Sequence, residues 1–87
     1  MTLSFPNPSR SYDDAHKTVR FWGHDGAFEI TFAIDIEALA KLQALAVLDE
    51  ATILRTFDRC RQRIIDVASA QYRRRRSSAY LLVAADF

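Results

Sequence analysis

One alternating stretch, TVRFWGHDGAFEITFAID, constrains the fold of this chain more than any other feature. Between residues 28 and 34 every second residue is phenylalanine or isoleucine, and the residues between them are polar or small. A period of two indicates a strand with one buried face. Val19 and Phe21 repeat the pattern upstream, and Asp25-Gly26 between the two runs is a pair that favours a two-residue turn. The stretch therefore predicts a β-hairpin.

The register of this hairpin depends on the length of its turn. A two-residue turn at Asp25-Gly26 places Phe21 opposite Ile30. The same turn places Val19 opposite Phe32, so that the four apolar side chains share one face. A four-residue loop would keep these faces, whereas a three-residue loop would scramble them because the side-chain period of a strand is two. The predicted core residues of the hairpin are Val19, Phe21, Phe28, Ile30 and Phe32.

The opposite face of the hairpin carries Arg20, Trp22 and His24, together with Glu29 and Thr31. A single tryptophan among polar neighbours commonly lies flat on a sheet, because single exposed apolar residues are frequent on protein surfaces. Tryptophan and arginine are also over-represented at binding hot spots. Arg20, Trp22 and His24 are therefore a candidate surface for a partner.

Two helices are predicted after the hairpin. Asp35 can cap a helix in the segment DIEALAKLQALA, and Asp49 can cap a longer helix over residues 50–73. On the long helix, apolar residues gather on one side and most arginines on the other, so one side is expected to pack on the sheet. The apolar side consists of Ile53, Leu54, Phe57, Cys60, Ile64, Ile65, Ala68 and Tyr72.

The two ends of the chain are expected to add strands. Thr2 to Phe5 forms a short edge strand in this interpretation, and Pro6 and Pro8 prevent a helix after it. Tyr80 to Ala85 is apolar at every position, which suits a strand covered on both faces or joined to another subunit. The predicted fold is α+β in the order β-β-α-α-β, to which the short N-terminal strand is added. Both helices pack on one face of an antiparallel sheet.

Size and composition bound the class of protein. The 87 residues predict a single domain, 1-87, and 49% hydrophobic with 26% charged residues is an ordinary globular composition. Cys60 is the one cysteine, so no intrachain disulfide can form, which fits a reducing compartment. The start MTLSFPNPSR lacks the apolar core of a signal peptide, and no apolar run approaches the ~20 residues of a membrane span. We expect a soluble, cytoplasmic protein without a membrane partner.

The arginines form two groups in a polarised chain. Residues 1–50 carry a charge of −4 and residues 51–87 carry +5, and every base in the second part is arginine. A basic helix face can follow phosphates. The structural alternative is that Asp58 and Asp66 neutralise arginines three residues away and that the run RRRR stabilises a helix end. We favour this alternative, because no aromatic residues are interleaved for stacking. The candidate nucleic-acid contacts are Arg55, Arg59, Arg63, Arg73, Arg74, Arg75 and Arg76.

No catalytic motif is recognisable in the sequence. The two histidines, His16 and His24, lie in polar contexts, and the apolar side of a helix makes Cys60 an inert thiol by default. Asp13, Asp14 and His16 do not recur at the spacing of a metal site. The two glycines belong to a turn rather than to a phosphate-binding loop. We expect no enzyme, cofactor or metal, and a reactive Cys60 is a distant third interpretation.

The whole arrangement resembles a family of short bacterial proteins catalogued as domain of unknown function 1488. The features that look alike are LSFPN at the start, the VRFWGHDGAFEITFAI hairpin, the LDEATILRTFDRCRQRI helix and a short C-terminal strand. The resemblance implies an α+β fold in a small cytosolic bacterial protein, and it supplies no catalytic residues. We expect a non-enzymatic binding module that contacts a protein partner or forms a homodimer through the last strand or the Trp22 face. The alternative is a weak nucleic-acid-binding accessory or regulator.

Overall fold

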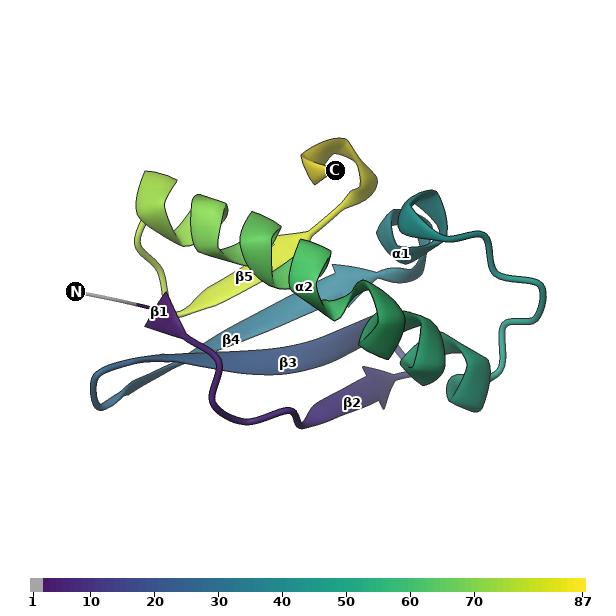
Figure 1. The fold of residues 1–87 in the computed structure, drawn as a ribbon, viewed down its shortest axis with the longest axis horizontal. Coiled ribbons are helices and arrows are strands. Elements are labelled where there is room, and N and C mark those ends of the chain that lie inside the picture. The colour runs from purple at the N-terminus through teal and green to yellow at the C-terminus, as the bar shows by residue number, and fades with distance from the viewer. Residues whose placement is uncertain (1–2) are drawn as a thin grey trace.

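The computed structural model of the protein describes residues 3–87, in which two helices lie over one face of a five-stranded sheet (Figure 1). The α+β prediction is confirmed. The strands are β1 (Leu3–Ser4), β2 (Arg10–Asp13), β3 (Thr18–Asp25), β4 (Phe28–Asp35) and β5 (Ala79–Leu82). The helices are α1 (Ile36–Leu42) and α2 (Glu50–Arg74), and the short 3-10 helix η1 (Ala84–Asp86) follows β5.

The sheet is mixed, so the prediction of a wholly antiparallel sheet is wrong. The strand order is β1-β3-β4-β5, and β5 pairs with β4 in parallel whereas β3 and β4 are antiparallel. The physical reason is the connection: α1 and α2 together carry the chain back to the end at which β4 began. A crossover of this kind joins parallel strands.

The N-terminal segment supplies two short strands to the same edge. β1 pairs with the end of β3 near the hairpin turn, and β2 pairs with its beginning. The predicted N-terminal strand is therefore confirmed at Leu3 and Ser4, while Thr2 lies outside the described residues. Pro6 and Pro8 lie in the gap between β1 and β2, where a residue without an N–H costs no ladder bond. The polar sequence of β2 gave no strand signal, and this strand was not predicted.

The hairpin register differs from the predicted one by two residues. The turn is Gly26-Ala27, because Asp25 pairs with Phe28 as a strand residue. Phe21 consequently lies opposite Phe32, not opposite Ile30, and Val19 lies opposite Ile34 instead of Phe32. Gly26 has φ of 61°, as expected for glycine at the first central position of a tight hairpin turn. A shift of two preserves the faces, so the side chains predicted to share one face of the hairpin still share it.

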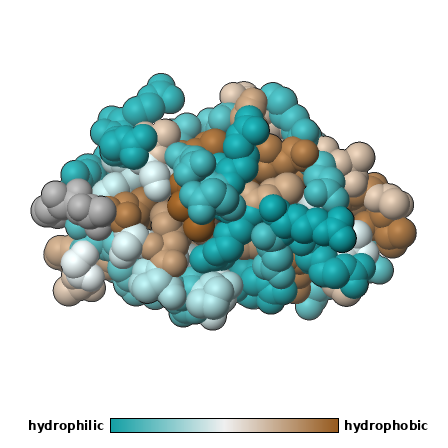
Figure 2. Space-filling view, in the orientation of Figure 1, coloured by the Kyte–Doolittle hydropathy of each residue, from teal (hydrophilic) through white to brown (hydrophobic). Residues whose placement is uncertain are grey.

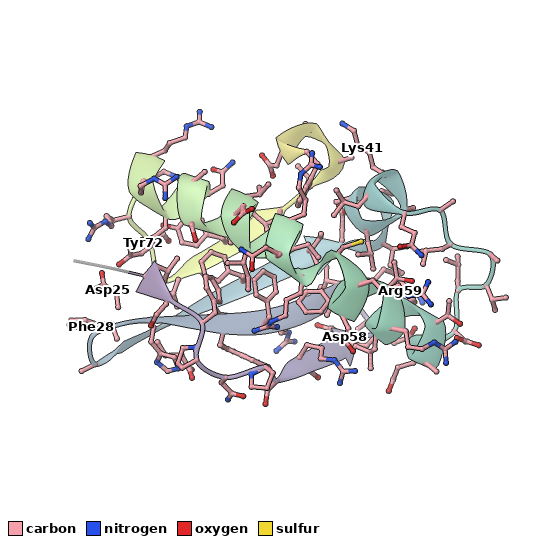
Figure 3. The ribbon with its side chains drawn as sticks, viewed as in Figure 1. Asp25, Phe28, Lys41, Asp58, Arg59 and Tyr72 are labelled. Carbon is pink, nitrogen blue, oxygen red and sulfur yellow. The ribbon has the colours of Figure 1, made fainter. Side chains whose placement is uncertain are left out.

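The core lies between the sheet and α2. Four of the five predicted hairpin core residues, Val19, Phe21, Ile30 and Phe32, are buried. Phe28 was predicted wrongly: 71% of its surface is exposed. It lies at the tip of the hairpin (Figure 3), beyond the first residue of β4 that pairs with β5. Because Phe28 alternates along β4 in step with Ile30 and Phe32, its side chain is directed to the helix side of the sheet. No described element covers the sheet at the hairpin tip.

The helix caps agree with the sequence. Asp35 accepts a hydrogen bond from the backbone N–H of Ala38 at 2.8 Å and starts α1. Asp49 accepts one from the backbone N–H of Thr52 at 2.7 Å and starts α2. The apolar side of α2 faces the sheet as expected, with Ile65 outside the core and Thr56 added to it. The buried residues of α2 are Ile53, Thr56, Phe57, Ile64, Ala68 and Tyr72.

Candidate functional site

The sheet face opposite the helices forms the first candidate surface, which we call the open face. The strand register places Arg20, Ala33 and Leu81 in one row across β3, β4 and β5. Trp22 and Thr31 lie in the next row. The outward residues of the open face are all exposed or half-buried: Arg20, Trp22, His24, Glu29, Thr31, Ala33, Ala79 and Leu81. The three residues predicted as a partner surface therefore share this face.

The centre of the open face is apolar. Trp22 is half-buried and lies diagonally across from Ala33, and Ala33 pairs with Leu81, which is 58% exposed. Diagonal neighbours in a sheet are close enough for a large side chain to touch. Arg20 and Glu29 lie on either side of the row that contains Trp22. Sequence reasoning found Trp22 but missed Leu81, because the position of β5 beside β4 is not a local property.

Arg20 forms an ion pair at the edge of the open face. Its Nη2 lies 2.6 Å from Oδ2 of Asp13 on β2, and Nδ1 of His16 lies 2.8 Å from the same oxygen. The hydrogen bond from Arg20, followed by that from His16, holds the pKa of Asp13 well below its usual range. Asp13 therefore stays ionised, and it holds Arg20 in place beside Trp22.

The outer edge of β5 is partly closed by side chains. The hydroxyl of Ser77 donates to the backbone carbonyl of Ala79 at 3.1 Å. At the other end, Oδ2 of Asp86 accepts from the backbone N–H of Val83 at 2.8 Å. These are the groups that an added strand would need, because alternate residues of a ladder point their backbone groups outward. Leu81 is left between them, which makes this edge a short template for strand addition.

The outward side of α2 forms the second candidate surface. Asp58 is bound by Arg10 of β2 through two hydrogen bonds of 2.9 Å, and Asp66 accepts one from Gln62 at 3.0 Å. The prediction that these aspartates pair with neighbouring arginines of α2 is therefore wrong. Figure 2 shows hydrophilic side chains along the outward side of α2. Within residues 3–87, no carboxylate lies within 4.0 Å of the guanidinium groups of Arg55, Arg59 and Arg63.

The four consecutive arginines do not act as one group. Arg73 and Arg74 extend the last turn of α2 and are exposed. The Arg75 guanidinium lies 5.5 Å from the centre of the Tyr80 ring, and the Tyr80 hydroxyl donates to the Arg75 carbonyl. Arg76 faces a different aromatic ring, described below. The run therefore divides into two outward arginines and two that turn back toward the sheet.

A buried contact joins the end of α2 to the hairpin. The Tyr72 hydroxyl donates to Oδ2 of Asp25 at 2.5 Å, and Asp25 is only 4% exposed (Figure 3). The Arg76 guanidinium lies 4.8 Å from the centre of the Tyr72 ring and 3.6 Å from the same carboxylate oxygen. The hydrogen bond to Asp25, with burial, raises the pKa of Tyr72. This contact keeps Asp25 in β3 and explains why the turn begins one residue later than predicted.

A model of the family described as "Protein of unknown function (DUF1488)" matches residues 3–83. The chain belongs to this family. A similar solved structure is a crystal structure of a DUF1488 protein of unknown function from Shewanella loihica PV-4, at 1.60 Å resolution. The two chains are 16% identical, the match covers 94% of each, and the TM-score is 0.82. This likeness establishes the shared fold. A search of the curated proteins found no match.

The other side chains singled out in this DUF1488 chain offer little chemistry. Cys60 is half-buried in α2, and burial raises the pKa of its thiol against a smaller opposite effect of Arg59. A less ionised thiol is a poorer nucleophile. His24 and Asp25 point to opposite faces of β3. Within residues 3–87, no three His, Cys, Asp or Glu side chains meet as a metal site, and no helix is both long and apolar enough to cross a bilayer.

Proposed function

We propose that this DUF1488 protein is a non-enzymatic binding module of the bacterial cytoplasm that pairs with a second copy of itself through the open face. The observation that carries the proposal is the apolar centre formed by Trp22, Ala33 and Leu81 on a sheet face that no described element covers. Burying such a centre against another sheet is the usual way in which two sheets pack. Tryptophan and arginine are the residues that most often dominate such contacts.

Charge complementarity supports a second copy as the occupant. In a two-fold pair, each contact between residues i and j occurs twice. Arg20 and Glu29 lie on opposite sides of the pair formed by Trp22 and Thr31. A two-fold axis along the row that contains this pair brings Arg20 of each copy toward Glu29 of the other, with Trp22 of each copy near the axis and Ala33 and Leu81 covered by the facing sheet. The partial closure of the β5 edge by Ser77 and Asp86 favours this face over the last strand as the interface.

The test is the oligomeric state of matched surface variants. Leu81→Glu places a charge in the apolar centre and should convert a dimer into a monomer in light scattering at high micromolar concentration. Val47→Glu is the control, because Val47 is exposed to a similar degree, 55%, in the loop between α1 and α2. It should remain a dimer. A wild-type protein that is strictly monomeric contradicts self-association, and a dimeric Leu81→Glu variant contradicts the choice of face.

A second candidate function is weak nucleic-acid binding in an accessory or regulatory role. The observation that favours it is the diversion of Asp58 to Arg10, which leaves the outward arginines of α2 without the neutralising partner that the sequence suggested. Exposed arginines on a helix are suited to phosphate contacts, which supply most of the affinity in non-specific binding to nucleic acid.

A further inference from the structure

We infer that Arg55, Arg59 and Arg63 form a binding site for the phosphate backbone of double-stranded DNA on the outward side of α2. This inference rests on the second candidate function and specifies its ligand and its residues. The four consecutive arginines at the end of α2, Arg73 to Arg76, are not the centre of this site.

The first argument is uncompensated charge. The three arginines are exposed, and among residues 3–87 only Arg55 makes a side-chain hydrogen bond, of 3.5 Å to the hydroxyl of Thr52. Asp58, which lies among them in the sequence, gives both carboxylate oxygens to Arg10. Figure 3 shows Asp58 on the side of α2 nearer β2, with Arg59 beside it. None of the three therefore has a carboxylate within 4.0 Å among residues 3–87, although Asp49 lies near enough to Arg55 for the arginine's charge to help lower the pKa of its carboxyl.

The second argument is spacing. Residues four apart on a helix lie on the same side and about 6 Å apart along its axis. Arg55, Arg59 and Arg63 therefore form a row about 12 Å long on one side of α2. A DNA strand offers a phosphate every 3.4 Å along the duplex axis, so long arginine side chains at these intervals can each meet a separate phosphate.

The third argument selects the kind of nucleic acid. The aromatic residues of α2, Phe57 and Tyr72, are buried against the sheet, so the outward side offers no ring on which an unpaired base could stack. An α-helix is about 10–12 Å wide and matches the roughly 12 Å major groove of B-form DNA. The major groove of A-form RNA is too deep and narrow for side chains to read. These features favour duplex DNA.

The limits of the site follow from its neighbours. Asp66 comes one turn after Arg63 on the same side of the helix, and its bond to Gln62 leaves its negative charge in place. Arg73 and Arg74 lie beyond it, near the end of α2. Arg75 and Arg76 stack on Tyr80 and Tyr72 instead. We therefore place Asp66 at the boundary of the site as a charge that repels phosphate.

The test is fluorescence anisotropy with a labelled mixed-sequence DNA duplex between about 50 and 200 mM salt. Three phosphate contacts should contribute about −2.7 to the slope of log affinity against log salt. The variant R55Q/R59Q/R63Q should therefore bind more weakly than the wild type at about 50 mM salt, and over this range its affinity should fall by a factor roughly forty times smaller than that of the wild type. The control variant R75Q/R76Q should keep most of the wild-type affinity. Asp66→Asn should bind more tightly than the wild type.

Each contrary result has a distinct meaning, with folding of every variant checked by circular dichroism. A wild type that does not bind the duplex at about 50 mM salt, where such contacts are strong, overturns both the second candidate function and this site. Wild-type binding that R55Q/R59Q/R63Q retains overturns the site alone. Tighter binding of an RNA duplex or of single strands, measured with the same label, overturns the choice of DNA.

Discussion

The two faces of the β3–β4 hairpin share one backbone ladder but differ in what lies against them. On the helix side, the rings of Phe21 and Phe32 stack with centroids 5.3 Å apart, and Phe57 of α2 lies 5.2 Å from Phe21. On the open face, Trp22 and Thr31 are only half-buried and nothing in residues 3–87 packs over them. The helix-side face is thus buried in the core, while the open face leaves its side chains exposed or half-buried.

Close packing of the helix-side face extends to its glycine. Gly23 is a buried strand residue, and a Cβ at this position would lie 2.9 Å from the ring of Phe5 and 3.0 Å from Leu3. The absence of a side chain lets the N-terminal segment fold over the sheet, where Phe5 also approaches the ring of Phe32 at 5.6 Å.

The largest expected effect compares Ile30 with Trp22. Ile30→Ala should lower the free energy of unfolding by about 2–5 kcal/mol, because it leaves a cavity in the core. Trp22→Ala should cost less in the monomer despite the larger side chain, because Trp22 is half-buried. Denaturant titration at low protein concentration measures both. A greater loss for Trp22→Ala than for Ile30→Ala would reverse the assignment of faces.

An intermediate effect is expected where α2 is bonded to the helix-side face. Tyr72→Phe removes the hydroxyl that donates to Asp25, and a buried acceptor that loses its donor is destabilising. The midpoint of thermal unfolding should fall, though by less than in Ile30→Ala. Tyr12→Phe is the control, because the Tyr12 hydroxyl makes only an exposed 3.4 Å bond to Asp14. Equal midpoints for the two variants would mean that the Tyr72 bond contributes nothing specific.

The smallest effect is expected at the ion pair that borders the open face. The pKa of Asp13 is lowered in the folded protein, first by Arg20, so its ionised form stabilises the fold above the unfolded pKa of about 4. This stabilisation is lost as the pH falls from about 4 through the lower folded value. Asp13→Asn should therefore lose less stability than the wild type between neutral and acidic pH. Parallel pH profiles of the thermal midpoint would show that this pair has no effect on stability.

Much of the fold was predictable because it depends on neighbours in the chain. The period of two separated the buried Phe21 from the outward Trp22, and Asp35 and Asp49 cap helices through backbone groups three residues away. The candidate partner surface was predictable for the same reason, since Arg20, Trp22 and His24 alternate along one strand. The exposure of Phe28 was not predictable in this way. The period of two indicates to which face of the sheet a side chain is directed, but it does not indicate whether another element packs on that side chain.

The sequence by itself determined the strands of the hairpin, the two helices and the division of their faces, because periodicity and capping act over a few residues. Tertiary structure decided which charges remain unpaired and where the hairpin turns. Asp58 could meet arginines of its own helix, yet it binds Arg10, 48 residues away. Asp25 could enter the turn, yet Tyr72, 47 residues away, keeps it in β3. Such choices depend on which elements pack together, and packing is set by the shape of the whole core and not by local pattern.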